Sequence, residues 1–98
     1  MGTGTSATAI GQARERHPIW IDVRTPREYA DGHLPGAVNL PLNELASKIE
    51  ALVPDKDTPV MLYCRSGNRS GQALRILRGM GYTQAVNKGA YRSLIQQR

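Results

Sequence analysis

An α/β fold with a small, mostly parallel sheet flanked by helices on both faces is predicted by three observations. Short apolar runs rich in β-branched residues alternate with segments whose apolar residues recur at helical spacing. No internal repeat and no linker divides the 98 residues, which suffice for one hydrophobic core. We therefore expect residues 1–98 to form a single domain, with 1–9 as a flexible N-terminal tail.

The first half of the chain predicts two strands and a short helix. Residues 10–17 fit one or two helical turns, and the apolar run Ile19–Val23 fits a buried strand. Thr25–Glu28 has the Ser/Thr-x-x-Glu form of a capping box, with proline at the first helical position. A short helix should begin there and end near Gly32, and Gly36–Leu40 is a second strand candidate.

The second half predicts the longer helices. From Leu42 to Val53 the apolar residues keep helical spacing, and Pro54 follows them. Val60–Tyr63 is a short apolar strand, and a helix should begin near Ser70 and close at Gly81. The last predicted elements are a strand over Ala85–Asn87 and a helix over Tyr91–Gln97.

Cys64, the only cysteine, directly follows a predicted strand. In open parallel sheets ligands bind at the carboxyl ends of the strands, so its position indicates a site. The loop before the next helix contains Gly67, which permits a tight bend, and the cations of Arg65 and Arg69. Helix N–H groups and guanidinium charge stabilise a thiolate, which predicts a pKa below the usual value of about 8.5. The residues alone leave open an inert, buried cysteine.

Composition excludes several other classes of function. The net charge is +5, but the 13 lysines and arginines are scattered without interleaved aromatic residues, which argues against nucleic-acid binding. A single cysteine excludes an internal disulfide, and the two histidines show no metal-ligand spacing. We expect no metal, no cofactor, no membrane contact and a monomer. The N-terminus lacks the order of a secretory signal, so we expect a cytoplasmic protein, or a periplasmic one if a signal peptide has been removed.

Four motifs, in this order along the chain, resemble the rhodanese (sulfurtransferase) domain, with similarity from about Ile19 to Gly89. They are Asp22-Val23-Arg24 at a strand end; Glu28-Tyr29 followed by Gly32-His33-Leu34-Pro35-Gly36-Ala37; Asn39-Leu40-Pro41 before a helix; and Tyr63-Cys64-Arg65-Ser66-Gly67-Asn68-Arg69-Ser70. The segments 70–73 and 80–82 are similar to short single-domain rhodaneses of the phage-shock protein E type. The family often has a Gly-Gly pair near the last strand, where this chain has Gly89-Ala90.

The resemblance implies a thiosulfate sulfurtransferase. Cys64 would take a sulfane sulfur from thiosulfate or a similar anionic donor, and a thiophile such as cyanide, a thiol or a protein would remove it. The substrate would be bound by Arg65, Ser66, Gly67, Asn68, Arg69 and Ser70. In this interpretation, the two arginines bind the donor's anionic end and Ser70 hydrogen-bonds the sulfur. Asp22 and Arg24 would have a supporting role, with Arg24 pairing with Glu28 as scaffolding.

Two alternatives remain open at this point. Cysteine phosphatases and arsenate-handling enzymes of the same fold carry a Cys-x-x-x-x-x-Arg loop, with five residues between the cysteine and the arginine. In this chain only four residues separate Cys64 from Arg69. The shorter loop favours one sulfur atom over a tetrahedral phosphate. The other alternative is a non-enzymatic sulfur carrier or redox-responsive binding module, which turnover rates would distinguish from an enzyme.

Overall fold

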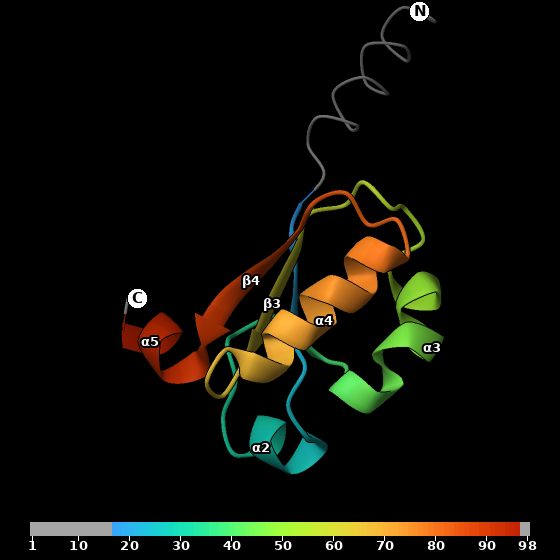
Figure 1. The fold of residues 1–98 in the computed structure, drawn as a ribbon. Coiled ribbons are helices and arrows are strands. Elements are labelled where there is room, and N and C mark those ends of the chain that lie inside the picture. The colour runs from blue at the N-terminus through green and yellow to red at the C-terminus, as the bar shows by residue number, and fades with distance from the viewer. Residues whose placement is uncertain (1–16, 97–98) are drawn as a thin grey trace, which may run out of the picture.

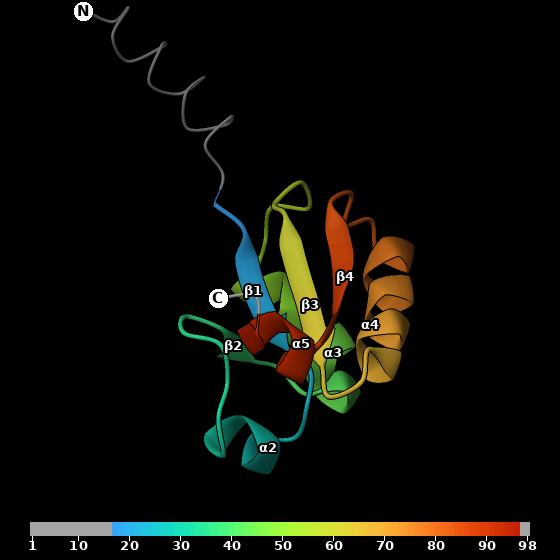
Figure 2. The same cartoon turned by 90° about the vertical axis from the view of Figure 1, so that its left-hand side faces the viewer.

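A four-stranded, entirely parallel sheet with helices on both sides makes up residues 17–96, the part of the chain that the computed structural model describes (Figure 1). The strand order is β2-β1-β3-β4, which Figure 2 shows from one face of the sheet. The predicted tail at 1–9 and the turns predicted over 10–17, except residue 17, lie outside the described residues. The strands are β1 (Ile19–Asp22), β2 (Val38–Asn39), β3 (Val60–Cys64) and β4 (Ala85–Ala90).

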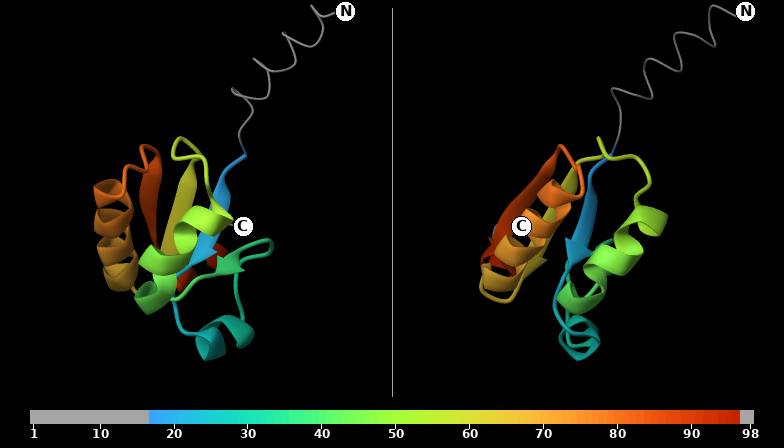
Figure 3. Two further views of the ribbon diagram at one scale, coloured as in Figure 1. Left: turned by 90° about the vertical axis from the view of Figure 1, so that its right-hand side faces the viewer. Right: turned by 45° about the vertical axis from the view of Figure 1, so that its right-hand side comes forward.

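The helices are α2 (Pro26–Ala30), α3 (Leu42–Leu52), α4 (Asn68–Gly79) and α5 (Tyr91–Gln96). Helices α3 and α4 cover one face of the sheet, and α5 lies on the other (Figures 1 and 3). The predicted fold class is therefore confirmed. Within residues 17–96, none of the helices has both the length and the apolar character needed to cross a membrane.

Strand β3 divides the core into two parts because its side chains alternate between the two faces of the sheet. Val60, Leu62 and Cys64 point into the larger cluster, which is completed by residues of α3 and α4. Tyr63 points into the smaller cluster on the other face, together with Leu94 of α5. All four of these β3 side chains are fully buried, so the strand sets the Cys64 backbone at the end of the core.

Several element boundaries differ from the sequence prediction. Strand β2 spans only Val38–Asn39, β1 ends at Asp22 and β3 ends at Cys64, and two further differences lie at α4 and β4. Helix α4 begins at Asn68 rather than near Ser70, because Gly67 adopts φ +96° and turns the chain directly into the helix. Strand β4 continues to Ala90 instead of ending at Asn87. Its pairing with β3 shifts by one residue, since Leu62 pairs with Asn87 but Tyr63 pairs with Gly89. This bulge, an extra residue in β4, allows the pairing between β4 and β3 to resume beyond Asn87.

The predicted capping box at the start of α2 is confirmed. The Thr25 hydroxyl oxygen accepts a hydrogen bond from the Glu28 N–H at 3.2 Å, and the Thr25 N–H donates to Glu28 Oε1 at 2.9 Å. The two bonds satisfy N–H groups that the first helical turn leaves free. They also place the Glu28 carboxylate at the end of the sheet where β3 and α4 meet.

Candidate active site

Cys64 is the last residue of β3, and residues 65–67 connect it to the N-terminus of α4. Residues 64–70 are called the Cys64 loop below. The first N–H groups of a helix have no partner within it, and they carry the positive end of the helix dipole. The short connection therefore sets the sulfur beside a group of free hydrogen-bond donors.

Two backbone N–H groups of the Cys64 loop donate to the sulfur. The nitrogen of Gly67 lies 3.0 Å from Cys64 Sγ, and that of Ser70 lies 3.4 Å away. The Ser70 hydroxyl oxygen is also 3.4 Å from the sulfur. The loop thus turns its donors inward, as a thiolate requires.

Hydrogen bonding lowers the pKa of the Cys64 thiol despite its burial. Burial, the largest single influence, raises the pKa because it disfavours the charged sulfur. The hydroxyl and N–H of Ser70 lower the pKa, as do the N–H groups of Ser66 and Gly67, and together they outweigh burial. The Cys64 residue has 0% exposed surface, so a donor reaches the sulfur only when the loop or the side chain moves.

The two arginines of the loop have different surroundings. Arg69 forms a two-pronged ion pair with Glu28, with Nη1–Oε1 and Nη2–Oε2 distances of 2.8 and 3.0 Å. Arg65 is exposed, lines a cavity and makes no ion pair with any residue in 17–96. The contacts of Arg69 favour a role in holding α2 against the loop over the donor-binding role that the sequence indicated. Arg65 is available for an anion.

The predicted pairing of Arg24 with Glu28 is wrong, because Arg24 binds Asp22. Arg24 Nε lies 2.9 Å from Asp22 Oδ1, and Arg24 Nη2 lies 2.6 Å from Asp22 Oδ2 and 2.7 Å from the Gly32 carbonyl oxygen. Arg24 precedes α2, so its side chain turns back along the strand rather than along the helix. Asp22 and Arg24 are 0% and 5% exposed, which makes the pair part of the interior.

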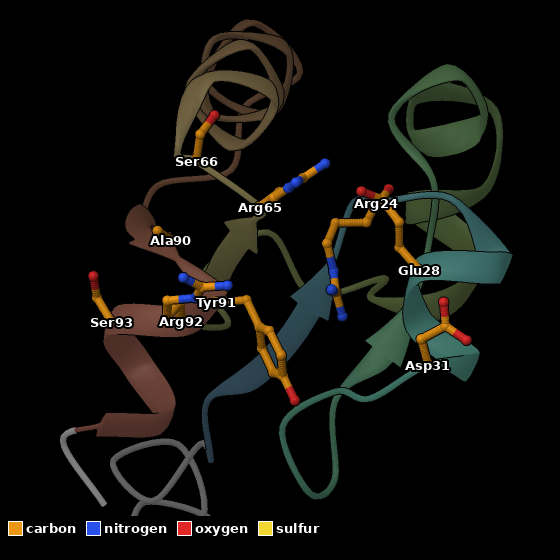
Figure 4. A pocket seen from close by; sticks show the side chains of 9 residues that line it. All are labelled: Arg24, Glu28, Asp31, Arg65, Ser66, Ala90, Tyr91, Arg92 and Ser93. Carbon is orange, nitrogen blue, oxygen red and sulfur yellow. The ribbon is translucent and has the colours of Figure 1, made fainter.

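A cavity of about 660 Å³ opens beside the Cys64 loop (Figure 4). In Figure 4 the side chains of the β4–α5 junction lie across it from the carboxylates of Glu28 in α2 and Asp31 just after it. Asn68 does not line this cavity and is exposed at the start of α4. The lining residues are Arg24, Glu28, Asp31, Arg65, Ser66, Ala90, Tyr91, Arg92 and Ser93.

Sequence reasoning missed Asn87, an exposed residue of β4 whose side chain contacts the loop. Its Nδ2 donates to the Gly67 carbonyl at 3.1 Å, and its Oδ1 accepts from the Ser70 hydroxyl at 2.7 Å. The only sequence signal was an asparagine two residues before Gly89, a spacing typical of a local side-chain–backbone turn. That signal does not reveal a contact with a loop some twenty residues earlier.

The sequence model of the protein family described as "Rhodanese-like domain" matches residues 6–94. The chain belongs to the rhodanese family. This rhodanese is 47% identical over 75 residues to the thiosulfate sulfurtransferase PspE of Escherichia coli K12, covering 76% of the chain and 72% of PspE. It is 35% identical to a human thiosulfate:glutathione sulfurtransferase, covering 94% of this chain and 87% of the human one.

A solved structure described as a rhodanese with anions from E. coli superimposes with a TM-score of 0.75 at 46% identity. The alignment covers 78% of this rhodanese and 89% of the E. coli chain. Together, the family model, the relatives and this structure confirm the predicted family, the fold class and the prediction of a sulfurtransferase enzyme.

Proposed function

We propose that this protein moves a sulfane sulfur from thiosulfate, or a similar anionic donor, to a thiophilic acceptor through a persulfide on Cys64. The observation that carries the proposal is the set of N–H donors of the Cys64 loop converging on one sulfur whose pKa they lower. The names of two relatives, PspE and the human enzyme, support thiosulfate as the donor.

In the first half-reaction the Cys64 thiolate attacks the outer sulfur of thiosulfate. A new sulfur–sulfur bond forms to Cys64, the bond to the sulfonate sulfur breaks, and its electron pair leaves with sulfite. Arg65 binds the sulfonate oxygens, because its guanidinium is exposed beside the loop. The loop N–H groups stabilise the negative charge before and after the transfer.

In the second half-reaction an acceptor attacks the outer sulfur, and the electron pair of the sulfur–sulfur bond returns to Cys64 Sγ. The cavity beside the loop, about 660 Å³, offers more room than thiosulfate needs and is typical in size of small-molecule sites. Arg65 and Arg92 line it without an ion pair to any residue in 17–96. These cations favour a thiol that carries carboxylates, and the human relative is named for one such thiol, glutathione.

Mass spectrometry of protein incubated with thiosulfate tests the first half-reaction. The protein should gain the mass of one sulfur atom on Cys64, release sulfite, and form thiocyanate when cyanide is added. Cys64→Ser should abolish all three results while leaving the fold intact. An unchanged mass of the wild-type protein, with its thiol shown to be free, would reject the proposal.

The acceptor is tested by single-turnover transfer from the loaded protein. Arg92→Gln should leave loading by thiosulfate unchanged and slow transfer to glutathione about tenfold, because one charge-assisted contact is lost. Transfer to cysteamine, a thiol without a carboxylate, should be unaffected by the same substitution. Equal slowing with both thiols would show that Arg92 does not bind the acceptor's carboxylate.

One observation favours a second candidate function, a slow sulfur carrier. Cys64 has no exposed surface, so access to the sulfur depends on a motion of the loop. A carrier would load fully in a single turnover, yet turn over no faster than the loop opens. Steady-state thiocyanate formation at saturating donor and acceptor separates the two candidates.

A further inference from the structure

Asn87 makes three hydrogen bonds around the Cys64 loop, and the proposed chemistry uses none of them. Its Nδ2 donates to the Gly67 carbonyl at 3.1 Å. Its Oδ1 accepts from the Gly89 N–H at 2.9 Å and from the Ser70 hydroxyl at 2.7 Å. An exposed side chain of β4 therefore reaches a fully buried hydroxyl of α4.

The orientation of the Asn87 amide is determined by its neighbours. Exchanging its oxygen and nitrogen would set an NH₂ group against the Gly89 N–H and a carbonyl oxygen against the Gly67 carbonyl. The bulge in β4 places Gly89 at φ +94°, and its N–H turns back to the Asn87 side chain. The amide oxygen is thus held toward Ser70.

The Ser70 hydroxyl has two acceptors for one hydrogen. Asn87 Oδ1 is 2.7 Å from Ser70 Oγ, and Cys64 Sγ is 3.4 Å from it. A hydroxyl rotates to suit its surroundings and donates only one hydrogen bond. Because Ser70 is 0% exposed, water does not compete for that hydrogen.

We propose that Asn87 is a positioning residue that accepts the Ser70 hydroxyl hydrogen whenever Cys64 Sγ is uncharged, so that the hydroxyl turns between amide and sulfur during transfer. This inference rests on the proposed function, since it follows the charge on Cys64 through the two half-reactions. It assigns to Asn87 no contact with the donor or the acceptor.

The charge on the sulfur drives the rotation. The resting thiolate draws the hydroxyl hydrogen to Sγ, because bonds to an ionised acceptor are stronger than bonds to a neutral amide. In the persulfide the charge lies on the outer sulfur, Sγ is neutral, and the hydroxyl turns to Asn87. When the acceptor removes the outer sulfur, the bonding electron pair returns to Sγ and the hydroxyl turns back. The hydrogen stays covalently bound to Ser70 throughout.

Without Asn87, the buried hydroxyl would have no good acceptor in the persulfide form, and an unsatisfied buried group is unfavourable. In the resting enzyme, the Asn87 amide oxygen competes with the Cys64 thiolate for the Ser70 hydroxyl hydrogen. The charged groups around the sulfur are common to every variant below and form a constant background. They are Arg65 in the loop and Arg69 on α4, which interacts electrostatically with Cys64 and is paired with Glu28 on α2. The Asp22–Arg24 pair is self-neutralised, and Lys88 of β4 lies over the Trp20 ring.

Titration of the Cys64 thiolate by ultraviolet absorbance, with Cys64→Ser subtracted as a baseline, tests the inference. Asn87→Leu removes the competing acceptor and should lower the midpoint by about one pH unit. Asn87→Asp keeps an acceptor in the same place, makes it stronger and adds a negative charge, so the midpoint should rise. Opposite shifts from two substitutions of similar size are not expected of a merely structural residue. Val86→Thr, on an exposed position of the same strand, is the control and should titrate as wild type.

The Ser70→Ala background shows whether Asn87 acts through the hydroxyl. In Ser70→Ala the midpoint of the Cys64 titration should be higher than in wild type, and adding Asn87→Leu should not shift it further. An unchanged or raised midpoint in Asn87→Leu, or the same shift in both backgrounds, would overturn the inference. Since no donor is present, the titration remains decisive even if thiosulfate fails to load Cys64 and the proposed function is rejected.

Discussion

The carboxyl ends of the inner strands β1 and β3 lie side by side, and an arginine follows each within two residues, yet the two regions differ in what their polar groups contact. After β1, the Asp22 carboxylate and the Arg24 guanidinium bind each other, and the Gly32 carbonyl takes a further hydrogen bond from Arg24. After β3, several donors face one sulfur and Arg65 has no ion-pair partner within residues 17–96. Mutually satisfied groups form scaffolding, whereas donors gathered around one anion form a site for chemistry.

The largest effect on stability is expected at the β1 end. Asp22→Ala leaves the buried Arg24 charge unpaired, which should reduce the free energy of unfolding by about 3–5 kcal/mol. Urea unfolding measures the loss. The double variant Asp22→Ala/Arg24→Met removes both charges and should recover more than half of it. A loss below about 1 kcal/mol in the single variant would show that the pair is not scaffolding.

The next largest effect is expected at the bend after β3. Gly67→Ala places a side chain at φ +96°, which strains the backbone whose N–H donates to Cys64 Sγ, so the loop should shift and sulfur transfer should fall about tenfold or more. Gly81→Ala is the matched control, because Gly81 has the same φ but open space around it. Both variants should lose about 1–2 kcal/mol of stability. Equal rates of sulfur transfer in the two variants would mean that the backbone geometry of the bend after β3 does not affect catalysis.

A smaller effect should separate the two loop arginines. Arg65→Gln should raise the KM for thiosulfate about tenfold, since it removes a charge-assisted contact with the donor. Arg69→Gln should change the KM less and lower the melting temperature more, because Arg69 binds Glu28. Steady-state kinetics and thermal unfolding of the two variants provide the comparison. A greater rise in KM from Arg69→Gln would restore the donor-binding role indicated by the sequence.

The smallest effect concerns the pH dependence of the Glu28–Arg69 ion pair. The hydrogen bond from Arg69 is the largest influence on the pKa of Glu28 and lowers it from 4.5 to about 2. A lowered folded-state pKa adds stability above the unfolded value, and that stability is lost as the pH falls from about 4.5 to about 2. Urea unfolding across this range should therefore show a difference of about 0.2–1 kcal/mol between wild type and Glu28→Gln at neutral pH that disappears in acid. A difference that does not vary with pH would exclude this pair as its source.

Local patterns predicted most of the fold. The capping box at Thr25–Glu28 and the helical spacing after Leu42 depend on neighbouring residues alone, and both helices formed as expected. The predicted end of β4 was wrong because a distant partner decides it. Strand β4 extends past Asn87 because Tyr63 and Cys64 of β3 continue the pairing across the bulge.

The ion pairs were also decided by residues distant in the sequence rather than by local spacing. Arg24 and Glu28 are four residues apart, which resembles a pair on one helix turn, but Arg24 lies before the helix and turns to Asp22. Glu28 instead meets Arg69, a residue forty-one positions later. Spacing along the chain cannot supply a partner that only the packing of α2 against the loop brings near.

The sequence by itself determined the α/β fold, the family and the place of the sole cysteine at a strand end, because periodicity and turn residues act over a few neighbours. The tertiary structure alone decided which charges are neutralised, that Cys64 is covered, and that Asn87 reaches Ser70. Those outcomes depend on the parallel alignment of β1, β3 and β4, which brings together side chains that no local pattern connects.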